Sequence, residues 1–288
     1  MAHTTRLAGP PGFNQRCDAI DRLELQLADF ASDRGAGQPE RGSALRDQAA
    51  ALCQQLEQMN AEVVQGLRHE IAAGRCLGEN LLHELQRYRA KPLESGTDGN
   101  LEYDSLDVLV AGILGTDRLL DEGPAVSLPE MVPYQPTPAR IVLEVVEQTH
   151  LGPHDTFVDI GSGLGVVPAL VSLLSGATSI GIEVQASYCR HAEEAVRGLN
   201  LANVSFVCQD ARLADLSVGT VFYMYTPFKG AMLQQVLERL HAEGRRRGIR
   251  LCTYGPMLSE AVRQPSFPAF EQGPLAQGAL AVFHTRPT

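Results

Sequence analysis

The 288-residue sequence predicts a helical N-terminal domain followed by an α/β domain with a mainly parallel sheet. Before residue 130, apolar residues recur at spacings of three and four, which is typical of amphipathic helices. After it, short apolar segments alternate with helical ones, as in successive βαβ units. At the end, two strand-like segments have no helix between them, which predicts an antiparallel edge. We therefore expect domains over residues 1–129 and 130–288.

Helices in the first domain are expected over residues 13–30, 45–71, 81–88 and 105–114. Ser43 is the expected N-cap of the second helix, because a serine side chain can accept a hydrogen bond from the first turn. Leu-rich helices need an apolar partner. We expect this domain either to cap a substrate site or to form a homodimer.

Parallel strands in the second domain are expected at Thr156–Ile160, Ser179–Glu183, Val204–Gln209, Thr220–Tyr225 and Arg250–Thr253. The helices between and around them are expected at Pro138–Thr149, Val166–Leu174, Ala186–Asn200, Gly230–Gly244 and Met257–Arg263. Right-handed crossovers would place the parallel strands in one sheet. The two final strands, Phe267–Gln272 and Ala279–Thr285, flank a Gly-Pro break.

Composition narrows the class of protein. The net charge of −10 argues against broad binding to nucleic-acid phosphates. Six scattered cysteines contain no Cys-x-x-Cys pair, so neither a metal site nor a disulfide framework is expected. Apolar runs are shorter than the roughly 18 residues of a membrane span, and residues 1–12 do not resemble a signal peptide. We expect a cytoplasmic protein without a membrane partner.

A glycine-rich loop follows the first expected strand. The sequence from Phe157 reads Phe-Val-Asp-Ile-Gly-Ser-Gly-Leu-Gly and leads directly into a helix. Glycines at a strand–helix junction let backbone approach a ligand, and the helix N-terminus adds positive potential. In open α/β sheets, ligands bind at the carboxyl ends of strands. Gly161, Ser162, Gly163 and Gly165 are therefore candidate cofactor-binding residues.

The spacing of this loop favours S-adenosylmethionine over a nicotinamide dinucleotide. A dinucleotide fingerprint reads Gly-x-Gly-x-x-Gly, whereas here the third glycine comes one position early and Val166 follows. Asp159 precedes the loop; its carboxylate would repel a pyrophosphate but suits an ammonium or sulfonium group. A nicotinamide dehydrogenase is therefore disfavoured.

Two more carboxylates follow the next two expected strands. Glu183 ends the second strand about 20 residues past the loop, where a carboxylate can accept both ribose hydroxyls. Asp210 follows the third strand and can accept from an adenine amino group, while the amide of Ala211 can donate to the ring. Three carboxylates at the ends of three strands are more specific than the glycines alone.

The motifs Phe157–Gly165, Gly181–Glu183 and Asp210 resemble those of the Rossmann-fold, or class I, S-adenosylmethionine-dependent methyltransferases. The residues of these motifs look most like those of the non-SET histone-lysine methyltransferase branch and its bacterial relatives. The resemblance covers residues 130–288 and implies a seven-stranded sheet of order 3-2-1-4-5-7-6. It also implies S-adenosylmethionine as cofactor, with S-adenosylhomocysteine as product and no metal.

The segment Tyr134-Gln-Pro-Thr-Pro138 resembles the part of that group that precedes the glycine loop. The resemblance implies that it lies over the methionine end of the cofactor, which makes Tyr134 and Thr137 candidate contacts. A turn that uses two prolines to start a helix is the alternative, and it stays open.

The candidate acceptor site lies after the fourth strand, at Tyr225-Thr-Pro-Phe228. Amino-methyltransferases of nucleic acids often carry Asn/Asp-Pro-Pro-Tyr/Phe there; this sequence lacks the amide or carboxylate, which disfavours a base as acceptor. Tyr225, Thr226 and Phe228 remain as candidate pocket residues. Because no histidine is expected at a suitable strand end, transfer to nitrogen is favoured over base-assisted transfer to oxygen.

The sequence thus favours a methyltransferase that acts on a protein side chain or a small molecule. A non-catalytic module that binds the cofactor or a partner is the alternative, and only turnover separates the two. Arg245–Arg247 and Arg250 form a short basic run, which we interpret as a solvated helix end rather than a phosphate site. We do not expect nucleic acid as a partner.

Overall fold

The structure is a computed structural model. It describes residues 10–32, 39–89, 103–117, 129–255, 258, 261–264, 270–272 and 280–285. The chain divides into two compact bodies, residues 1–76 with 83–113 and residues 77–82 with 114–288. Across the described residues, no helix combines the length and apolar content that crossing a bilayer needs.

The first body is helical. Its helices are α1 (Pro10–Ser32), α2 (Pro39–Ala72), the second half of α3 (Glu79–Gln86) and most of α4 (Ser105–Leu114). The expectation that Ser43 caps the second helix is wrong, because α2 begins at Pro39 and Ser43 lies inside it. A proline fits the first helical turn well, since its fixed φ matches the helix and its missing N–H has no partner there.

Buried polar groups join α1 to α2. Arg16 Nε donates to Asn60 Oδ1 at 2.7 Å, and the Asn60 amide donates to Cys17 Sγ at 3.6 Å. Beside them, the rings of Phe13 and Tyr88 meet edge to face with centroids 5.5 Å apart. A paired buried polar set tolerates few other registers of two helices, so these contacts specify how α1 lies on α2.

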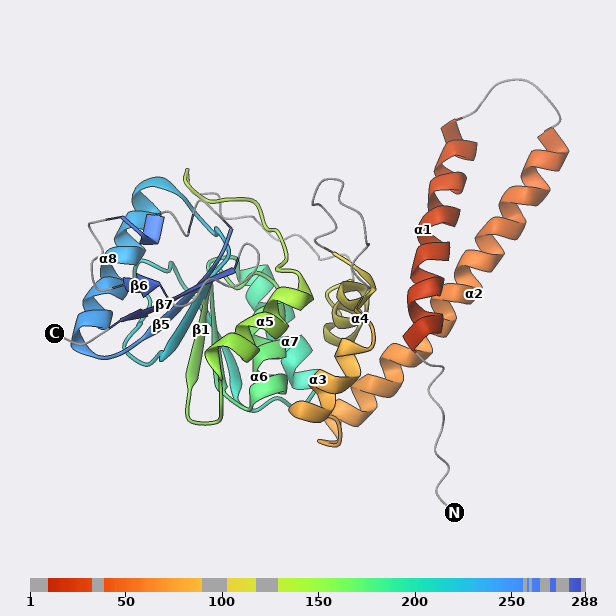
Figure 1. The fold of residues 1–288 in the computed structure, drawn as a ribbon. Helices are drawn as coiled ribbons and strands as arrows, with labels where there is room; N and C mark the ends of the chain where they lie inside the picture. Colours follow the sequence, from red (N-terminus) through yellow and green to blue (C-terminus); the bar gives the residue numbers. More distant parts are fainter. Residues whose placement is uncertain are drawn as a thin grey trace, which may run out of the picture. The chain divides into compact units, whose positions relative to one another are not determined.

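The second body is an α/β sandwich (Figure 1). Its elements in chain order are α5 (Ala139–Thr149), β1 (Thr156–Ile160), α6 (Val166–Ser175), β2 (Thr178–Glu183), α7 (Ala186–Gly198), β3 (Val204–Cys208), β4 (Val221–Met224), α8 (Gly230–Arg246), β5 (Arg250–Tyr254), β6 (Phe270–Gln272) and β7 (Leu280–Thr285). Of the expected helix Met257–Arg263, residues 257, 259 and 260 lie outside the described residues, while residues 258, 261 and 262 are helical.

The seven strands form one sheet in the order β3-β2-β1-β4-β5-β7-β6. Strands β1 to β5 pair in parallel, whereas β7 is antiparallel to both β5 and β6. This arrangement confirms the predicted α/β fold class, including the reversed last strand. The carboxyl ends of β1 to β4 therefore share one edge of the sheet.

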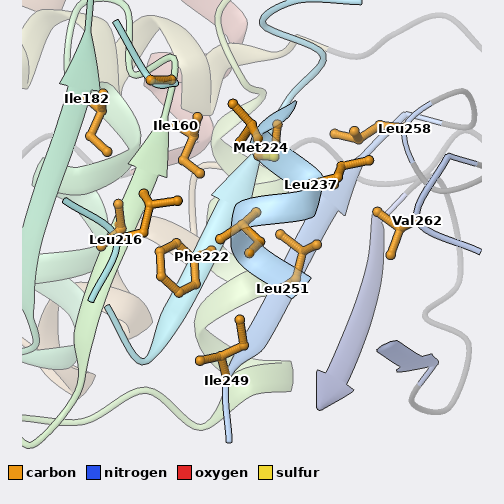
Figure 2. Packing of buried hydrophobic residues seen from close by; sticks show 14 of the residues in the cluster. Ile160, Ile182, Leu216, Phe222, Met224, Leu237, Ile249, Leu251, Leu258 and Val262 are labelled. Atoms are coloured by element: carbon orange, nitrogen blue, oxygen red, sulfur yellow. The ribbon is translucent and has the colours of Figure 1, made fainter. Parts of the chain in front are cut away.

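Helices cover both faces of the sheet: α8 lies on one, and α5, α6 and α7 lie on the other (Figure 1). Figure 2 shows the core beneath α8, where Ile160, Phe222 and Leu251 from three neighbouring strands pack with Leu237 of the helix. All four are fully buried, and each such side chain contributes about 1.5–3 kcal/mol. This packing holds the strand ends at the site in place.

At the opposite edge of the sheet, two arginines of the basic run bind backbone carbonyls. Arg250 donates to the Thr149 carbonyl and pairs with Asp155, and Arg247 Nη2 donates to the Leu216 carbonyl at 2.9 Å. The expectation of a solvated run is therefore wrong for these two residues, because their long side chains reach back to the turns before the strands. It holds for Arg246, whose side chain is 72% exposed.

Candidate functional site

A cavity of about 550 Å³ lies at the carboxyl ends of the parallel strands. It is lined by residues 131–135, 161, 182–185, 188, 209–211, 225–228 and 232. Its size is in the range of small-molecule sites, and its place is where α/β sheets bind ligands. The cavity brings together Tyr134, Gly161, Glu183, Asp210, Ala211, Tyr225, Thr226 and Phe228 of the predicted site. It does not reach Thr137, Asp159, Ser162, Gly163 or Gly165.

The glycine loop turns sharply after β1. Gly161, Gly163 and Gly165 all have positive φ, at 85°, 52° and 77°, which side chains rarely adopt. The N–H groups of Gly161 and Ser162 both donate to the Ile182 carbonyl, at 2.8 and 3.0 Å. A Cβ on Gly161 would lie 2.3 Å from Pro227, so only glycine lets the loop pass beneath the residues after β4.

Glu183, at the end of β2, binds three backbone N–H groups. Its Oε2 accepts from Gly163 at 2.9 Å, and its Oε1 accepts from Val184 and Gln185 at 2.7 and 2.8 Å. The side chain therefore gives hydrogen-bond acceptors to the two N–H groups that precede α7 and also holds the glycine loop. A carboxylate has about four acceptor positions, so Oε2 keeps a lone pair for a ligand hydroxyl.

Asp159 lies beneath the loop rather than at the cavity wall, and it is 3% exposed. Burial, together with the negative charge of Glu183, raises its pKa well above the usual range of an aspartate. A cation bound nearby would favour the ionised form.

Asp210 lines the cavity but is held by a residue that the sequence analysis missed. Arg212 donates to both carboxylate oxygens through Nε and Nη2, the latter at 2.6 Å, and its backbone N–H donates to Oδ1 at 2.9 Å. This pairing lowers the pKa of Asp210. Arg239 of α8 in turn donates to the carbonyl of Ala211 at 2.9 Å, so α8 positions the loop after β3.

The segment before α5 places its two candidate residues differently. The ring of Tyr134 lies at the cavity against Tyr188, with centroids 5.4 Å apart, and directly over Gly163. A Cβ on Gly163 would come within 2.1 Å of that ring. Thr137 is buried behind the cavity, where its hydroxyl shares a 3.0 Å hydrogen bond with the hydroxyl of Tyr223.

Two predicted loop residues pack into the protein. The hydroxyl of Ser162 is buried without a protein partner and points toward Gly181 of β2, where a Cβ would lie 2.5 Å from it. Gly165 is the N-cap residue of α6, and a Cβ there would meet Phe206 and Ala192 at 2.6 and 2.7 Å. Both residues set how closely the loop approaches β2 and β3.

Glu130 joins the segment before α5 to the start of α8, and no local sequence signal marks it. Its carboxylate accepts from the N–H groups of Ala231 and Met232 at 2.9 and 2.6 Å, and its carbonyl accepts from Lys229. These backbone hydrogen bonds lower its pKa. Glu130 therefore fixes two walls of the cavity against each other.

The residues after β4 form the aromatic end of the cavity. Tyr225 packs against Tyr254 with ring centroids 4.6 Å apart, and Phe228 is nearly buried and bridges to Met131. Thr226 has a positive φ of 42°, which is unfavourable for a β-branched residue. Such strain is often found at functional sites.

The donor set of this cavity fits S-adenosylmethionine. Glu183 offers an acceptor at the cavity wall, and Gly161 brings backbone to the same wall. The contact of Glu183 with ribose hydroxyls and the role of the buried Asp159 toward a sulfonium or ammonium stay predictions. Asp210 fits less directly, since Arg212 already occupies its oxygens. The adenine contact of Asp210 therefore stays a prediction.

One protein-family model matches part of this chain. Residues 132–211 match the family model described as "Histone methylation protein DOT1". The matched region contains Tyr134, the glycine loop, Glu183 and Asp210. No curated protein matches the chain.

Solved structures with a similar fold include several methyltransferases. An RNA methyltransferase from Salinibacter ruber, in complex with S-adenosyl-L-homocysteine, is 23% identical with a TM-score of 0.43; the match covers 53% of this chain and 94% of that one. A SAM-dependent methyltransferase from Aquifex aeolicus is 17% identical with a TM-score of 0.41, covering 50% and 88%. A SAM-dependent O-methyltransferase from Thermotoga maritima is 15% identical with a TM-score of 0.44, covering 54% and 68%.

The strand order with a reversed last strand, the acid-flanked glycine loop and the family match agree with one another. The cofactor is S-adenosylmethionine. The chain is an S-adenosylmethionine-dependent methyltransferase of the Rossmann-fold class.

Proposed function

We propose that this enzyme transfers the methyl group to an amine nitrogen of a protein side chain. The observation that carries the proposal is the chemistry at the aromatic end of the cavity. There, Tyr225, Thr226 and Phe228 are joined by Pro133, Pro227 and the side chains of Met131 and Met232. These groups offer aromatic faces, apolar surface and hydroxyls, but no ionised base.

The carboxylates at the cavity are already engaged. Glu183 accepts three backbone hydrogen bonds, and Asp210 is paired with Arg212. No histidine is among the described residues that line the cavity. Transfer to a hydroxyl usually needs a base to take its proton, whereas a neutral amine attacks with its own lone pair. The lining therefore supports nitrogen as the acceptor atom.

Apolar surroundings also prepare such an acceptor. Burial disfavours the charged form of an ammonium group, so its pKa falls and a larger fraction is neutral. The bound cofactor supplies a methyl group on a positively charged sulfur. The rings of Tyr225 and Phe228 exclude water from the acceptor, and the strained backbone at Thr226 presents polar atoms for its alignment.

The match to a histone methylation family supports a protein rather than a small molecule as substrate. The matched residues end before the acceptor segment Tyr225–Phe228, so the support comes from the cofactor half of the site. A side-chain amine on a long aliphatic chain would pass between the apolar walls near Met131 and Met232.

The test is transfer from methyl-labelled S-adenosylmethionine to proteins of a cell extract, followed by acid hydrolysis and identification of the labelled amino acid. We expect label in an N-methylated amino acid that survives mild alkali. Label released by mild alkali would indicate a carboxyl ester and overturn the proposal. Label confined to small molecules would place the substrate outside proteins.

A further inference from the structure

Two cysteines lie beside the cofactor cavity at the ends of neighbouring elements. Cys208 is the last residue of β3 and pairs in register with Glu183 of β2. Cys189 lies in the first turn of α7. The two sulfurs donate to consecutive carbonyls: Cys189 Sγ to Glu183 at 3.6 Å, and Cys208 Sγ to Val184 at 3.9 Å.

The environments of the two thiols differ. Cys208 is exposed, whereas Cys189 is 3% exposed. Burial, followed by a side-chain hydrogen bond with Cys208, raises the pKa of Cys189 to about 12. An oxidant in solution therefore reaches Cys208 first, and Cys189 is the neighbouring thiol that could react with an oxidised Cys208.

We propose that Cys189 and Cys208 form a reversible disulfide in response to a peroxide, and that this disulfide weakens cofactor binding. The Cys208 thiolate attacks one peroxide oxygen, which gives a sulfenic acid and releases hydroxide. The Cys189 sulfur then attacks the sulfenic sulfur; the S–S bond forms, and the sulfenic oxygen leaves as water with the Cys189 proton. The two sulfurs lose two electrons, which the peroxide gains.

The consequence for the cofactor follows from the carbonyls that the thiols contact. A disulfide has no S–H group, so Glu183 and Val184 both lose a donor. Both residues line the cavity, and Gln209, which follows Cys208, lines it as well. The Gln209 N–H donates to the Glu183 carbonyl at 2.9 Å, so a shift of Cys208 is passed to the residue that holds the glycine loop.

The test compares the reduced and peroxide-treated full-length protein in three measurements: thiol titration after denaturation, mass spectrometry of the linked peptides, and calorimetry with S-adenosylhomocysteine. We expect two of the six thiols to disappear and a Cys189–Cys208 peptide to appear. The affinity for S-adenosylhomocysteine should fall by roughly tenfold, which corresponds to the loss of about one net hydrogen bond. Dithiothreitol should restore this affinity.

Cys208→Ser and Cys189→Ser should each keep the affinity of the reduced protein after peroxide, and Cys208→Ser, at an exposed site, should fold normally. Cys76→Ser is the matched control, since its half-buried thiol lies in the helical body, and it should respond to peroxide like wild type. The proposal is overturned if both thiols stay free in excess peroxide, or if the linked protein binds S-adenosylhomocysteine as well as the reduced protein does.

Discussion

The carboxylate of Glu183 accepts a hydrogen bond from the backbone N–H of Gly163 at 2.9 Å, which joins the end of β2 to the loop after β1. The same side chain binds the first two N–H groups at the entrance to α7. A residue predicted as a ligand contact is therefore also a structural link. Changes at Glu183 should affect the shape of the site as well as its charge.

We expect Glu183→Ala to weaken binding of S-adenosylhomocysteine by at least about tenfold, because it removes an acceptor and leaves buried N–H groups unpaired. Calorimetry measures this directly. Glu194→Ala, an exposed change in α7, is the control and should bind like wild type. Equal affinity in the two variants would show that the ribose position is misassigned.

Asp159 gives a prediction about pH. Since its pKa is raised in the folded protein, the folded state keeps a proton that the unfolded state releases. The stability of the ligand-free protein should therefore fall as pH rises from the aspartate pKa of the unfolded chain, about 3.9, to the higher folded value. Asp159→Asn should remove this part of the pH dependence and weaken cofactor binding by about tenfold.

Urea denaturation across that pH range is the measurement for Asp159, with calorimetry for the cofactor. The exposed Asp117→Asn serves as control and should leave the pH profile of wild type unchanged. A variant Asp159→Asn with the wild-type profile would mean that Asp159 has the same pKa in the folded and the unfolded protein.

Replacing Thr226 should raise the stability of the protein and lower its activity. Its positive φ costs about 1 kcal/mol or more for a non-glycine residue, so Thr226→Gly should unfold at equal or higher temperature than wild type. Turnover should fall by roughly tenfold, because the backbone after β4 loses a defined conformation. A melting curve and a steady-state assay on the same sample test both parts. A lower melting temperature would contradict the assignment of strain.

Glu130→Ala should separate substrate binding from cofactor binding. Without the carboxylate, the start of α8 loses two hydrogen bonds, and the segment that carries Met131 and Tyr134 is no longer held there. We expect KM for the acceptor to rise by roughly fivefold and the affinity for S-adenosylhomocysteine to fall by a smaller factor, since Tyr134 is a candidate cofactor contact but Glu183 and the glycine loop stay in place. Because backbone hydrogen bonds lower the pKa of Glu130, the stability that its carboxylate contributes should be lost as pH falls through the lowered pKa.

The conservative variant Glu130→Gln keeps one acceptor oxygen and should recover part of the wild-type KM. A Glu130→Ala enzyme that loses cofactor and acceptor affinity in equal measure would indicate general unfolding of the region rather than positioning.

The fold was predictable because its signals are local. Strand β1 begins and ends at the predicted residues, since an apolar segment runs directly into glycines that cannot continue it. Helix α4 likewise matches its predicted range, Ser105–Leu114. The reversed strand β7 was predicted from the missing helix before it, aided by the family resemblance.

The contacts that complete the site were not predictable in this way. Glu130 and Met232 are 102 positions apart, and no pattern near either one announces the hydrogen bond between them. Arg212 is only two positions from Asp210, yet a solvated arginine and one that occupies a carboxylate look alike in sequence. Side-chain direction decided the outcome for Thr137 and Ser162, which the structure turns away from the cavity.

The contact between Ser162 and Gly181 limits which residues these two positions can hold. The hydroxyl of Ser162 fills the space that a Cβ at position 181 would need, so substitutions at the two positions depend on each other. A homologue with alanine at position 181 should carry glycine or alanine at position 162 and a smaller side chain at position 206, or should have its loop displaced, because the Phe206 ring lies 2.6 Å from the same point. In an alignment of relatives, substitutions at these positions should therefore occur together.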